Sequence, residues 1–262
     1  MFALADRQPQ PEPRWPGYAS TGAVTMADGP LDDAVISWQG SLFGFDDPSF
    51  DPSFIGVERI WLDEASWVDH LPAWLSGADL VFSELVARLP WRQRKVTMYG
   101  RLVDEPRLSW WWAETGDDPV HLELLEQIRV TLSMRYDERF DSIGCNLYRN
   151  GADSVAWHAD RVGRHIVEPL VAIVSVGAPR PFQMRPAGGG PSLSFLLGQG
   201  DLLVMGGGCQ RFWQHCVPKV AAAGPRLSIT YRHGSNPADE RDLKSGFDRA
   251  MTRRHPSLWS RA

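Results

Sequence analysis

The sequence predicts an α+β fold, in which a helical N-terminal part is followed by a small β-barrel or jelly roll. Two observations lead to this prediction. Apolar residues recur at helical intervals in the first half of the chain, whereas beyond about residue 135 they alternate with period two in short segments. Turn sequences such as Asn150-Gly151 and Gly206-Gly207-Gly208 separate those segments, as is typical of barrels and jelly rolls.

The 262 residues suit one large domain, because all-β barrels often reach this size as a single unit. Residues 1–30 are rich in Pro, Gly and Ala without a sustained period, so we expect a flexible N-terminal arm. A single domain is expected over residues 31–235 and a C-terminal tail over residues 236–262. The apolar fraction of 43% and the 12 tryptophans exclude a wholly disordered chain.

The cysteines and the apolar runs indicate a compartment. Cys145, Cys209 and Cys216 are odd in number and form no Cys-x-x-Cys pair, which argues against a disulfide framework and a zinc cluster. A cytoplasmic location is therefore expected. No apolar run approaches membrane-spanning length, so no membrane partner is expected, and we expect a monomer.

Charge is distributed unevenly along the chain. The formal net charge of -5 speaks weakly against indiscriminate nucleic-acid binding, which depends on Lys and Arg at the phosphates. Acidic residues crowd the stretch from Asp28 to Asp69, whereas basic residues gather between Arg88 and Arg107. This asymmetry fits either a local binding face or two solvated surfaces of opposite sign.

The N-terminal part is expected to contain helices and short strands. From residue 66 to residue 89 apolar residues recur at helical intervals, with Gly77 and Pro90 as breaks. This pattern predicts two helices, the second over Ala78–Arg88 and packed on a sheet. Extended segments are expected before and after them, at Val35–Trp38, Ile55–Leu62, Lys95–Tyr99 and Leu108–Trp112.

A third helix precedes the β region. Asp118-Pro119 is a good helix start, because Asp can cap the first turn and Pro lacks an N–H that is not needed there. The helix is expected to run to about Arg135, with one buried face formed by Leu122, Leu125, Ile128 and Leu132. Strands are then predicted at Cys145–Arg149, Leu170–Val176, Phe182–Arg185, Ser192–Leu197, Asp201–Met205 and Arg226–Arg232.

A His-x-Asp pair in the β region predicts a metal site. Residues two apart in an extended segment share a face, so His158 and Asp160 would point into one site. A distant histidine, His215, completes the two-histidine, one-carboxylate set of non-haem Fe(II) oxygenases. Such a set leaves the opposite positions of the ion open for a bidentate co-substrate and dioxygen. A single histidine of this kind is more often a structural residue than a metal ligand. The joint occurrence of His158, Asp160 and His215 nevertheless predicts an iron site.

The last predicted strand is polar on one face, which carries Arg226, Ser228, Thr230 and Arg232. Facing solvent, it would be an ordinary edge strand, but beside an iron site it can line a cavity. An arginine there can clamp a carboxylate by two charge-assisted hydrogen bonds, which implies a dicarboxylate co-substrate. Arg226 and Arg232 lie roughly 20 Å apart on a straight strand, so the clamp is assigned to Arg226 first.

In these residues the chain resembles the AlkB-like Fe(II)/2-oxoglutarate dioxygenases, which remove N-alkyl groups from nucleic-acid bases. The resemblance covers roughly residues 77–233. It rests on four ordered motifs, which are Asn146-x-Tyr148, His158-x-Asp160, the segment from Trp213 to Pro218 and the run from Arg226 to Arg232.

The resemblance implies a site, and we expect a core that is a double-stranded β-helix, or jelly roll, with the N-terminal helices packed on its sheet. Dioxygen, Fe(II) and 2-oxoglutarate would be the cofactors. The implied iron ligands are His158, Asp160 and His215. The implied 2-oxoglutarate contacts are Asn146, Tyr148, Arg226 and Arg232. Trp110 and Trp112 share a strand face and are candidates for stacking on an extruded base.

The expected function is Fe(II)/2-oxoglutarate-dependent oxidative demethylation of N-alkylated bases in DNA or RNA, with release of formaldehyde and succinate. One alternative is a 2-oxoglutarate oxygenase that acts on a protein side chain or small metabolite. Arg161-Val162 suits it, because DNA-repair members often carry acidic residues directly after the His-x-Asp motif. The other alternative is a non-catalytic jelly-roll sensor of metal or 2-oxoglutarate, although a sensor has no need of open coordination positions.

Overall fold

Two antiparallel sheets face each other in the structure, a computed structural model that describes residues 22–25, 35–38, 47–98, 100–113, 123–160 and 166–234. The larger sheet has the strand order β4 (Glu58–Trp61), β5 (Ser66–Leu71), β15 (Asp201–Gly207), β12 (Val171–Gly177), β17 (Arg226–His233), β10 (Phe140–Tyr148), β9 (Leu108–Ala113). The smaller sheet has the order β11 (Val155–His158), β16 (Trp213–Val217), β13 (Arg180–Pro186), β14 (Leu193–Leu197).

The chain alternates between the two sheets from β10 onward. The strands β10, β12, β15 and β17 belong to the larger sheet, and the strands β11, β13, β14 and β16 belong to the smaller one. Neighbouring strands within each sheet are antiparallel and mostly not consecutive in sequence. This winding is a double-stranded β-helix, or jelly roll, so the predicted fold class is confirmed.

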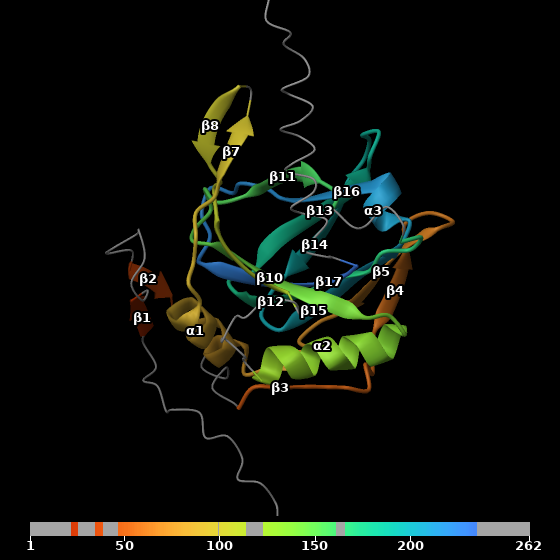
Figure 1. Ribbon diagram of the computed structural model, residues 1–262, viewed down its shortest axis with the longest axis horizontal. Coiled ribbons are helices and arrows are strands. Elements are labelled where there is room, and N and C mark those ends of the chain that lie inside the picture. The colour runs from red at the N-terminus through yellow and green to blue at the C-terminus, as the bar shows by residue number, and fades with distance from the viewer. Residues whose placement is uncertain are drawn as a thin grey trace, which may run out of the picture.

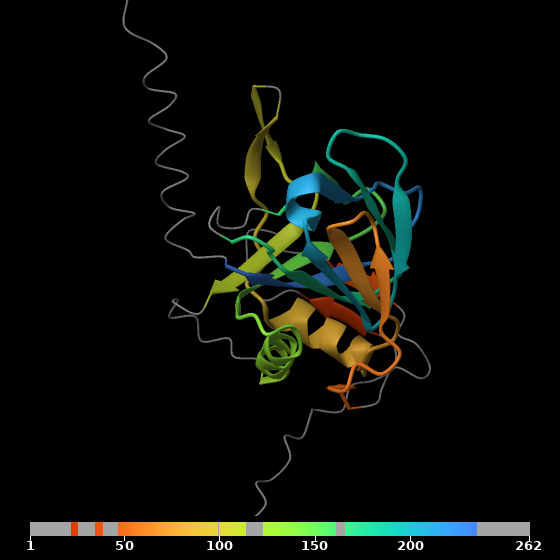
Figure 2. The same cartoon turned by 90° about the vertical axis from the view of Figure 1, so that its right-hand side faces the viewer.

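Besides the two sheets and two longer helices, the described part of the chain contains three short strand pairs and a short helix. The pairs are β1 (Gly22–Thr25) with β2 (Val35–Trp38), β3 (Ser49–Phe50) with β6 (Leu75–Ser76), and β7 (Lys95–Met98) with β8 (Arg101–Asp104). The β7–β8 hairpin projects beyond the two sheets, as Figures 1 and 2 show. Helix α3 (Cys209–Phe212) connects β15 to β16.

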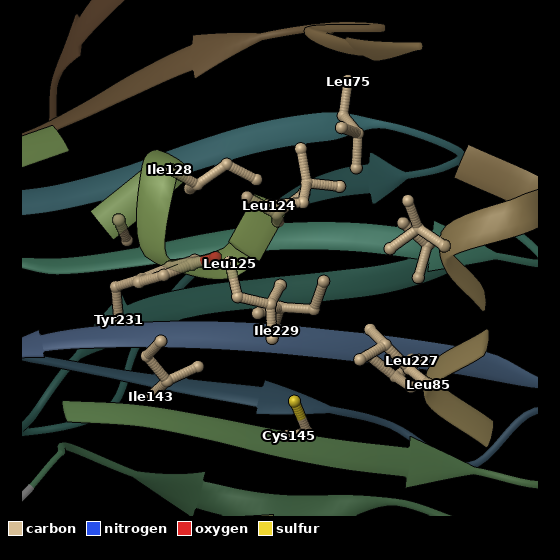
Figure 3. Packing of buried hydrophobic residues seen from close by; sticks show 14 of the residues in the cluster. Leu75, Leu85, Leu124, Leu125, Ile128, Ile143, Cys145, Leu227, Ile229 and Tyr231 are labelled. Atoms are coloured by element: carbon tan, nitrogen blue, oxygen red, sulfur yellow. The ribbon is translucent and has the colours of Figure 1, made fainter. Parts of the chain in front are cut away.

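Two longer helices, α1 (Ala78–Arg88) and α2 (Glu123–Tyr136), cover the outer side of the larger sheet (Figure 1). As predicted, α1 begins after Gly77 and ends before Pro90. It packs on β12, whereas α2 packs on β10. Figure 3 shows leucines and an isoleucine of α2 above apolar side chains of β10 and β17, in an outer core that includes Leu124, Leu125, Ile128, Ile143, Ile229 and Tyr231.

A second core lies between the two sheets. Alternate residues of a strand point to opposite sides. In β12, therefore, Ala172 and Val174 join the outer core, whereas Val171 and Ile173 turn inward. Inward side chains of the larger sheet meet Phe182 of the smaller sheet in this second cluster. Pairing of β17 with β12 brings Arg226, Ser228, Thr230 and Arg232 to the same inner side, which places the polar face of β17 inside the jelly roll.

The prediction of a helix before Gly77 is wrong. Residues 66–71 form β5, which pairs with β4 and β15. The spacing of Trp67, Leu71 and Leu75 imitates a helical period, but the pairing on both sides satisfies the backbone of β5 as a strand. Tertiary pairing therefore outweighs the local pattern.

The predicted strand Val35–Trp38 and the predicted helix Ala78–Arg88 appear with the expected bounds, whereas most other predicted elements have shifted ends. The predicted strand at Cys145 belongs to β10, which begins earlier, at Phe140. The predicted helix start at Asp118-Pro119 lies outside the described residues, and α2 is described from Glu123 onward. Strand β1 falls within the range expected to be a flexible arm. The domain boundaries at residues 31 and 235 stay predictions.

Candidate active site

Strand pairing in the smaller sheet brings the predicted metal ligands together. Strands β11 and β16 are antiparallel, and His158 lies directly opposite His215, with 4.3 Å between the ring centroids. Asp160 follows β11 by two residues, and one potential ligand atom from each of the three side chains lies within 4.8 Å of the others. His215 is also stacked on Phe182 of β13. Both histidines and the carboxylate therefore converge on one point.

Asp160 is buried and held as a carboxylate. Arg232 donates from Nε at 3.0 Å and from Nη2 at 2.9 Å to the same oxygen, Oδ1. The other oxygen, Oδ2, lies 3.4 Å from Nε2 of His215. Burial alone would raise the pKa of Asp160, but the charge of Arg232 and the hydrogen bond from His215 outweigh it and hold the pKa well below its ordinary value. The group is therefore an anionic oxygen donor at neutral pH.

His158 is neutral and correctly oriented for a metal. Burial, and then the proximity of His215, lower the pKa of His158 to about 4. Its Nδ1 lies 2.8 Å from the carbonyl oxygen of Ala156, and because a carbonyl can only accept, Nδ1 carries the proton. The lone pair is then on Nε2. Metal-binding histidines commonly bind the metal through one ring nitrogen and donate the N–H of the other to a carbonyl or carboxylate oxygen. This set of imidazole and carboxylate donors fits Fe(II).

Arg226 lies inside the jelly roll as a buried cation. Only 1% of its surface is exposed, and its Nε donates to Oγ of Ser175 at 2.8 Å. Its Nη2 has no hydrogen-bond partner among the described residues. Burial lowers the pKa of Arg226 to about 10, so the guanidinium is still charged at neutral pH. A buried, incompletely paired guanidinium is suited to binding a carboxylate.

Asn146 and Tyr148 share the inner face of β10 with the arginines of β17. Asn146 is paired with Ser228, and Tyr148 with Arg226, whose guanidinium carbon lies 5.5 Å from the Tyr148 ring centroid. Arg107 donates from Nε to Oδ1 of Asn146 at 3.1 Å. This bond orients the amide so that its NH₂ group is left to donate to a ligand. The four predicted co-substrate residues therefore line one interior face, with Arg226 and Arg232 at its two ends.

The candidate stacking residues Trp110 and Trp112 require a correction. Trp110 pairs with Cys145 and Trp112 with Ile143, so both point to the helix-covered side of the larger sheet. They are 8% and 9% exposed and belong to the outer core. A tryptophan in this position cannot reach the inner site without leaving the core, so the stacking role does not fit these two residues.

The middle tryptophan, Trp111, faces the site instead. It pairs with Gly144 on the inner side of β10. A Cβ atom added at Gly144 would lie 3.1 Å from Cδ1 of Trp111 and 2.8 Å from Nη1 of Arg232. The half-buried indole therefore lies over Gly144 beside Arg232. The sequence alone predicts that Trp111 and its two neighbours lie on opposite faces of β9. Which of these faces points to the site depends on the pairing with β10.

Two further residues of the site have no signal in the sequence. Arg107 lies just before the tryptophans and reaches Asn146 of the next strand. Gln210 on α3 accepts a hydrogen bond from the backbone N–H of Asp160 at 2.8 Å. Both contacts join residues distant in sequence, so no local pattern predicts them. Arg161 and Val162, which follow the His-x-Asp motif, lie outside the described residues.

A jelly roll with two histidines and a carboxylate at one point, and a buried arginine nearby, defines the class of metal- and 2-oxoglutarate-dependent oxygenases. The model of the 2OG-Fe(II) oxygenase superfamily matches residues 70–232, and the chain belongs to this superfamily. The expected cofactors Fe(II), 2-oxoglutarate and dioxygen are thereby confirmed.

The resemblance to the AlkB-like dioxygenases is also confirmed. The chain is 34% identical over 180 residues to alpha-ketoglutarate-dependent dioxygenase alkB homolog 3 of Bos taurus, covering 60% of this chain and 62% of that protein. It is 33% identical over 199 residues to the Homo sapiens protein of the same name, covering 68% and 66%. DNA oxidative demethylase ALKBH2 of Arabidopsis thaliana is 31% identical over 192 residues, covering 58% and 60%. The matches thus span less than two thirds of these relatives.

Proposed function

We propose that the protein demethylates N-alkylated bases in DNA or RNA by Fe(II)- and 2-oxoglutarate-dependent oxidation, with release of formaldehyde and succinate. The convergence of His158, Asp160 and His215 within 4.8 Å carries this proposal. In it, these three residues hold Fe(II). Two uncharged imidazoles and one carboxylate leave the ion with a net positive charge, which favours binding of an anionic co-substrate.

The inner faces of β10 and β17 are proposed to hold 2-oxoglutarate. Arg226 would pair with the distal carboxylate, because it is buried and charged and because its Nη2 has no partner in the described part of the chain. Tyr148 and the NH₂ group of Asn146 face the same space from β10. Arg232 directs Nε and Nη2 to Asp160 and lies with Nη1 over Gly144, so it can fix the iron ligand and donate to the co-substrate together.

When bound, Fe(II) with dioxygen and 2-oxoglutarate supplies the oxidation of an N-methyl C–H bond, as 2-oxoglutarate is converted to succinate and carbon dioxide. The hydroxymethyl product then breaks its C–N bond, and the base nitrogen gains a proton as formaldehyde leaves. The residues of the chain orient the reactants. Arg226 and Arg232 fix the co-substrate and the Asp160 ligand, and the buried apolar residues between the sheets restrict access of water.

Two surface features support a nucleic-acid substrate. Trp111 offers an aromatic face beside Arg232 at the site, where an extruded base could stack. The β7–β8 hairpin and the segment between α1 and β7 expose Arg92, Arg94, Lys95 and Arg101, which suit phosphate contacts. Similar proteins are named alkB homolog 3 and DNA oxidative demethylase ALKBH2, which agrees with this substrate class.

The proposal is tested by mass spectrometry of oligonucleotides that carry 1-methyladenine or 3-methylcytosine. The protein is incubated with Fe(II), 2-oxoglutarate and air, and each component is omitted in turn. We expect the methyl group to be replaced by hydrogen only when all components are present, because the oxidant requires all of them. His158→Ala is expected to abolish the change while the fold is retained.

The outcomes separate the proposal from its alternatives. Unchanged oligonucleotides with continued succinate formation would contradict the base assignment and favour a protein or metabolite substrate. Absence of succinate with every substrate would favour the sensor. Full activity of His158→Ala would refute the iron assignment.

We also propose a cytoplasmic, monomeric protein. The three cysteines are free and buried, which suits a reducing compartment. Among the residues that the structure describes, no helix has the length and apolarity needed to span a membrane. Gel filtration with light scattering tests the monomer, and fractionation tests the location.

A further inference from the structure

Asp160 lies beyond the end of β11, so its backbone needs a support other than a strand ladder. That support comes from Gln210, whose Oε1 accepts a hydrogen bond from the Asp160 N–H at 2.8 Å. Gln210 is 7% exposed, and its Nε2 lies 3.7 Å from the sulfur of Met205 on β15. Both ends of this amide are therefore engaged inside the protein.

Helix α3 contacts the chain on both sides of residues 161–165. Gln210 binds Asp160 before this segment, and the neighbouring Arg211 donates from Nη2 to the carbonyl oxygen of Ile166 after it. The helix leads directly into β16, which carries His215. Gln210 therefore links the part of the chain that carries Asp160 to the part that carries His215.

We propose that Gln210 is a positioning residue for the metal centre, an inference that rests on the proposed iron site. Two restraints define the direction of the Asp160 carboxylate. Arg232 holds its Oδ1, and Gln210 holds its backbone N–H. Loss of Gln210 leaves that N–H without its partner, so the backbone turns to find another one and the carboxylate moves relative to the two histidines. Partners that orient metal ligands typically change metal affinity by about 10- to 100-fold.

The test is a Mn(II) titration of the metal-free full chain in the presence of 2-oxoglutarate, with free Mn(II) measured by electron paramagnetic resonance. Gln210→Met retains the length and the apolar contacts but removes the acceptor. It is expected to weaken Mn(II) binding by about ten-fold or more, with at most a small decrease in the melting temperature of the metal-free protein. Gln210→Glu, which restores an acceptor oxygen, is expected to recover most of the affinity.

Arg211→Met is the matched control, because it changes the adjacent residue of α3 and leaves the Asp160 N–H bonded. Its Mn(II) affinity is expected to equal that of the wild type. Wild-type affinity in Gln210→Met would overturn the proposal, as would an equal loss in Arg211→Met. If Gln210→Met does not fold, Gln210→Asn decides, because its shorter amide cannot reach Asp160. Weakened binding supports the role, and unchanged binding overturns it.

Failure of this inference is distinguishable from failure of the proposed function. A wild-type protein that binds no Mn(II) would remove the metal site itself. Mn(II) binding without any base demethylation would change only the substrate, and the positioning role of Gln210 would stand.

Discussion

At the scale of single residues, Arg226 is the proposed partner of the distal carboxylate of 2-oxoglutarate. We predict that Arg226→Lys weakens 2-oxoglutarate binding by about ten-fold or more, because a charge-assisted hydrogen bond contributes about 1.5–3 kcal/mol. Lysine offers one point charge in place of a planar fork that contacts Ser175 and that, in the proposal, would bind a carboxylate at the same time. Calorimetric titration of 2-oxoglutarate with Mn(II) present measures the effect.

Arg185→Lys is the matched control for that experiment. Arg185 is paired with Gln214, the neighbour of His215, so it lies on the opposite face of the smaller sheet, over the ring of Trp157. Its replacement is expected to leave 2-oxoglutarate binding unchanged. An unaltered dissociation constant in Arg226→Lys would contradict the assignment of the distal carboxylate to this arginine.

The cysteines give a prediction that depends on pH. Burial raises the pKa of all three thiols, that of Cys209 to about 12. Because a raised pKa keeps a thiol protonated, the thiolate that reacts is scarce at pH 8. We expect the thiols of the native protein to react slowly with a disulfide reagent. In denaturant, three thiols per chain are expected to react rapidly. A rapid stoichiometric reaction of the native protein would contradict the burial of these residues.

At the scale of secondary-structure elements, one face of β9 borders the site with Trp111, and its other face packs in the outer core with Trp110. Trp111→Ala is expected to raise the KM for a methylated oligonucleotide several-fold and to leave the melting temperature nearly unchanged, since Trp111 borders the site. Trp110→Ala is expected to lower the free energy of unfolding by about 3–5 kcal/mol, since it empties part of the outer core. Steady-state kinetics and urea denaturation check the two effects.

The reverse result would contradict the assignment of the faces of β9. If Trp110→Ala weakened substrate binding without loss of stability, the indole of Trp110 would have to reach the inner site, which its pairing with Cys145 forbids.

Local periodicity predicted most of the helices and strands, because the spacing of apolar residues that marks a helix or a strand is visible within a short stretch of sequence. The alternation of Arg226 to Arg232 placed the polar face of β17 correctly, and the spacing of Leu125, Ile128 and Leu132 marked the buried face of α2. The helix expected over residues 66–76 failed, because the same apolar spacing fits a strand once β4 and β15 pair on both sides of it.

The site was predictable only where its residues lie close in sequence or in a characteristic order. His158 and Asp160 are two apart, and their shared direction follows from the backbone. Gln210 and Asp160 are 50 residues apart, and their contact exists only after β15, α3 and β11 have assembled. Which tryptophan of β9 faces the site likewise depends on the register of β9 with β10. No local pattern in the sequence predicts that register.

At the scale of the whole molecule, the metal and the co-substrate are expected to join the two sheets. The proposed iron ligands come from the smaller sheet and the segment after β11, whereas the proposed 2-oxoglutarate residues come from the larger sheet. Ligands that bind only the folded state stabilise it, by about 2.7 kcal/mol at a hundred-fold excess over the dissociation constant. We therefore predict that Mn(II) and 2-oxoglutarate together raise the melting temperature.

Differential scanning fluorimetry measures this stabilisation, with Arg226→Lys and His158→Ala as controls. The first variant is expected to lose the increment due to 2-oxoglutarate, and the second the increment due to Mn(II). A full shift in either variant would contradict the proposed division of the site between the two sheets.

The most direct test of the central claim is the stoichiometry of the products. Formaldehyde and succinate are quantified together in reactions of the wild type and of His158→Ala with a methylated oligonucleotide. We predict equal amounts of the two products from the wild type and neither from the variant, because each demethylation consumes one 2-oxoglutarate at the iron. Formaldehyde without succinate, or equal product formation by His158→Ala, would contradict an iron- and 2-oxoglutarate-dependent demethylation at this site.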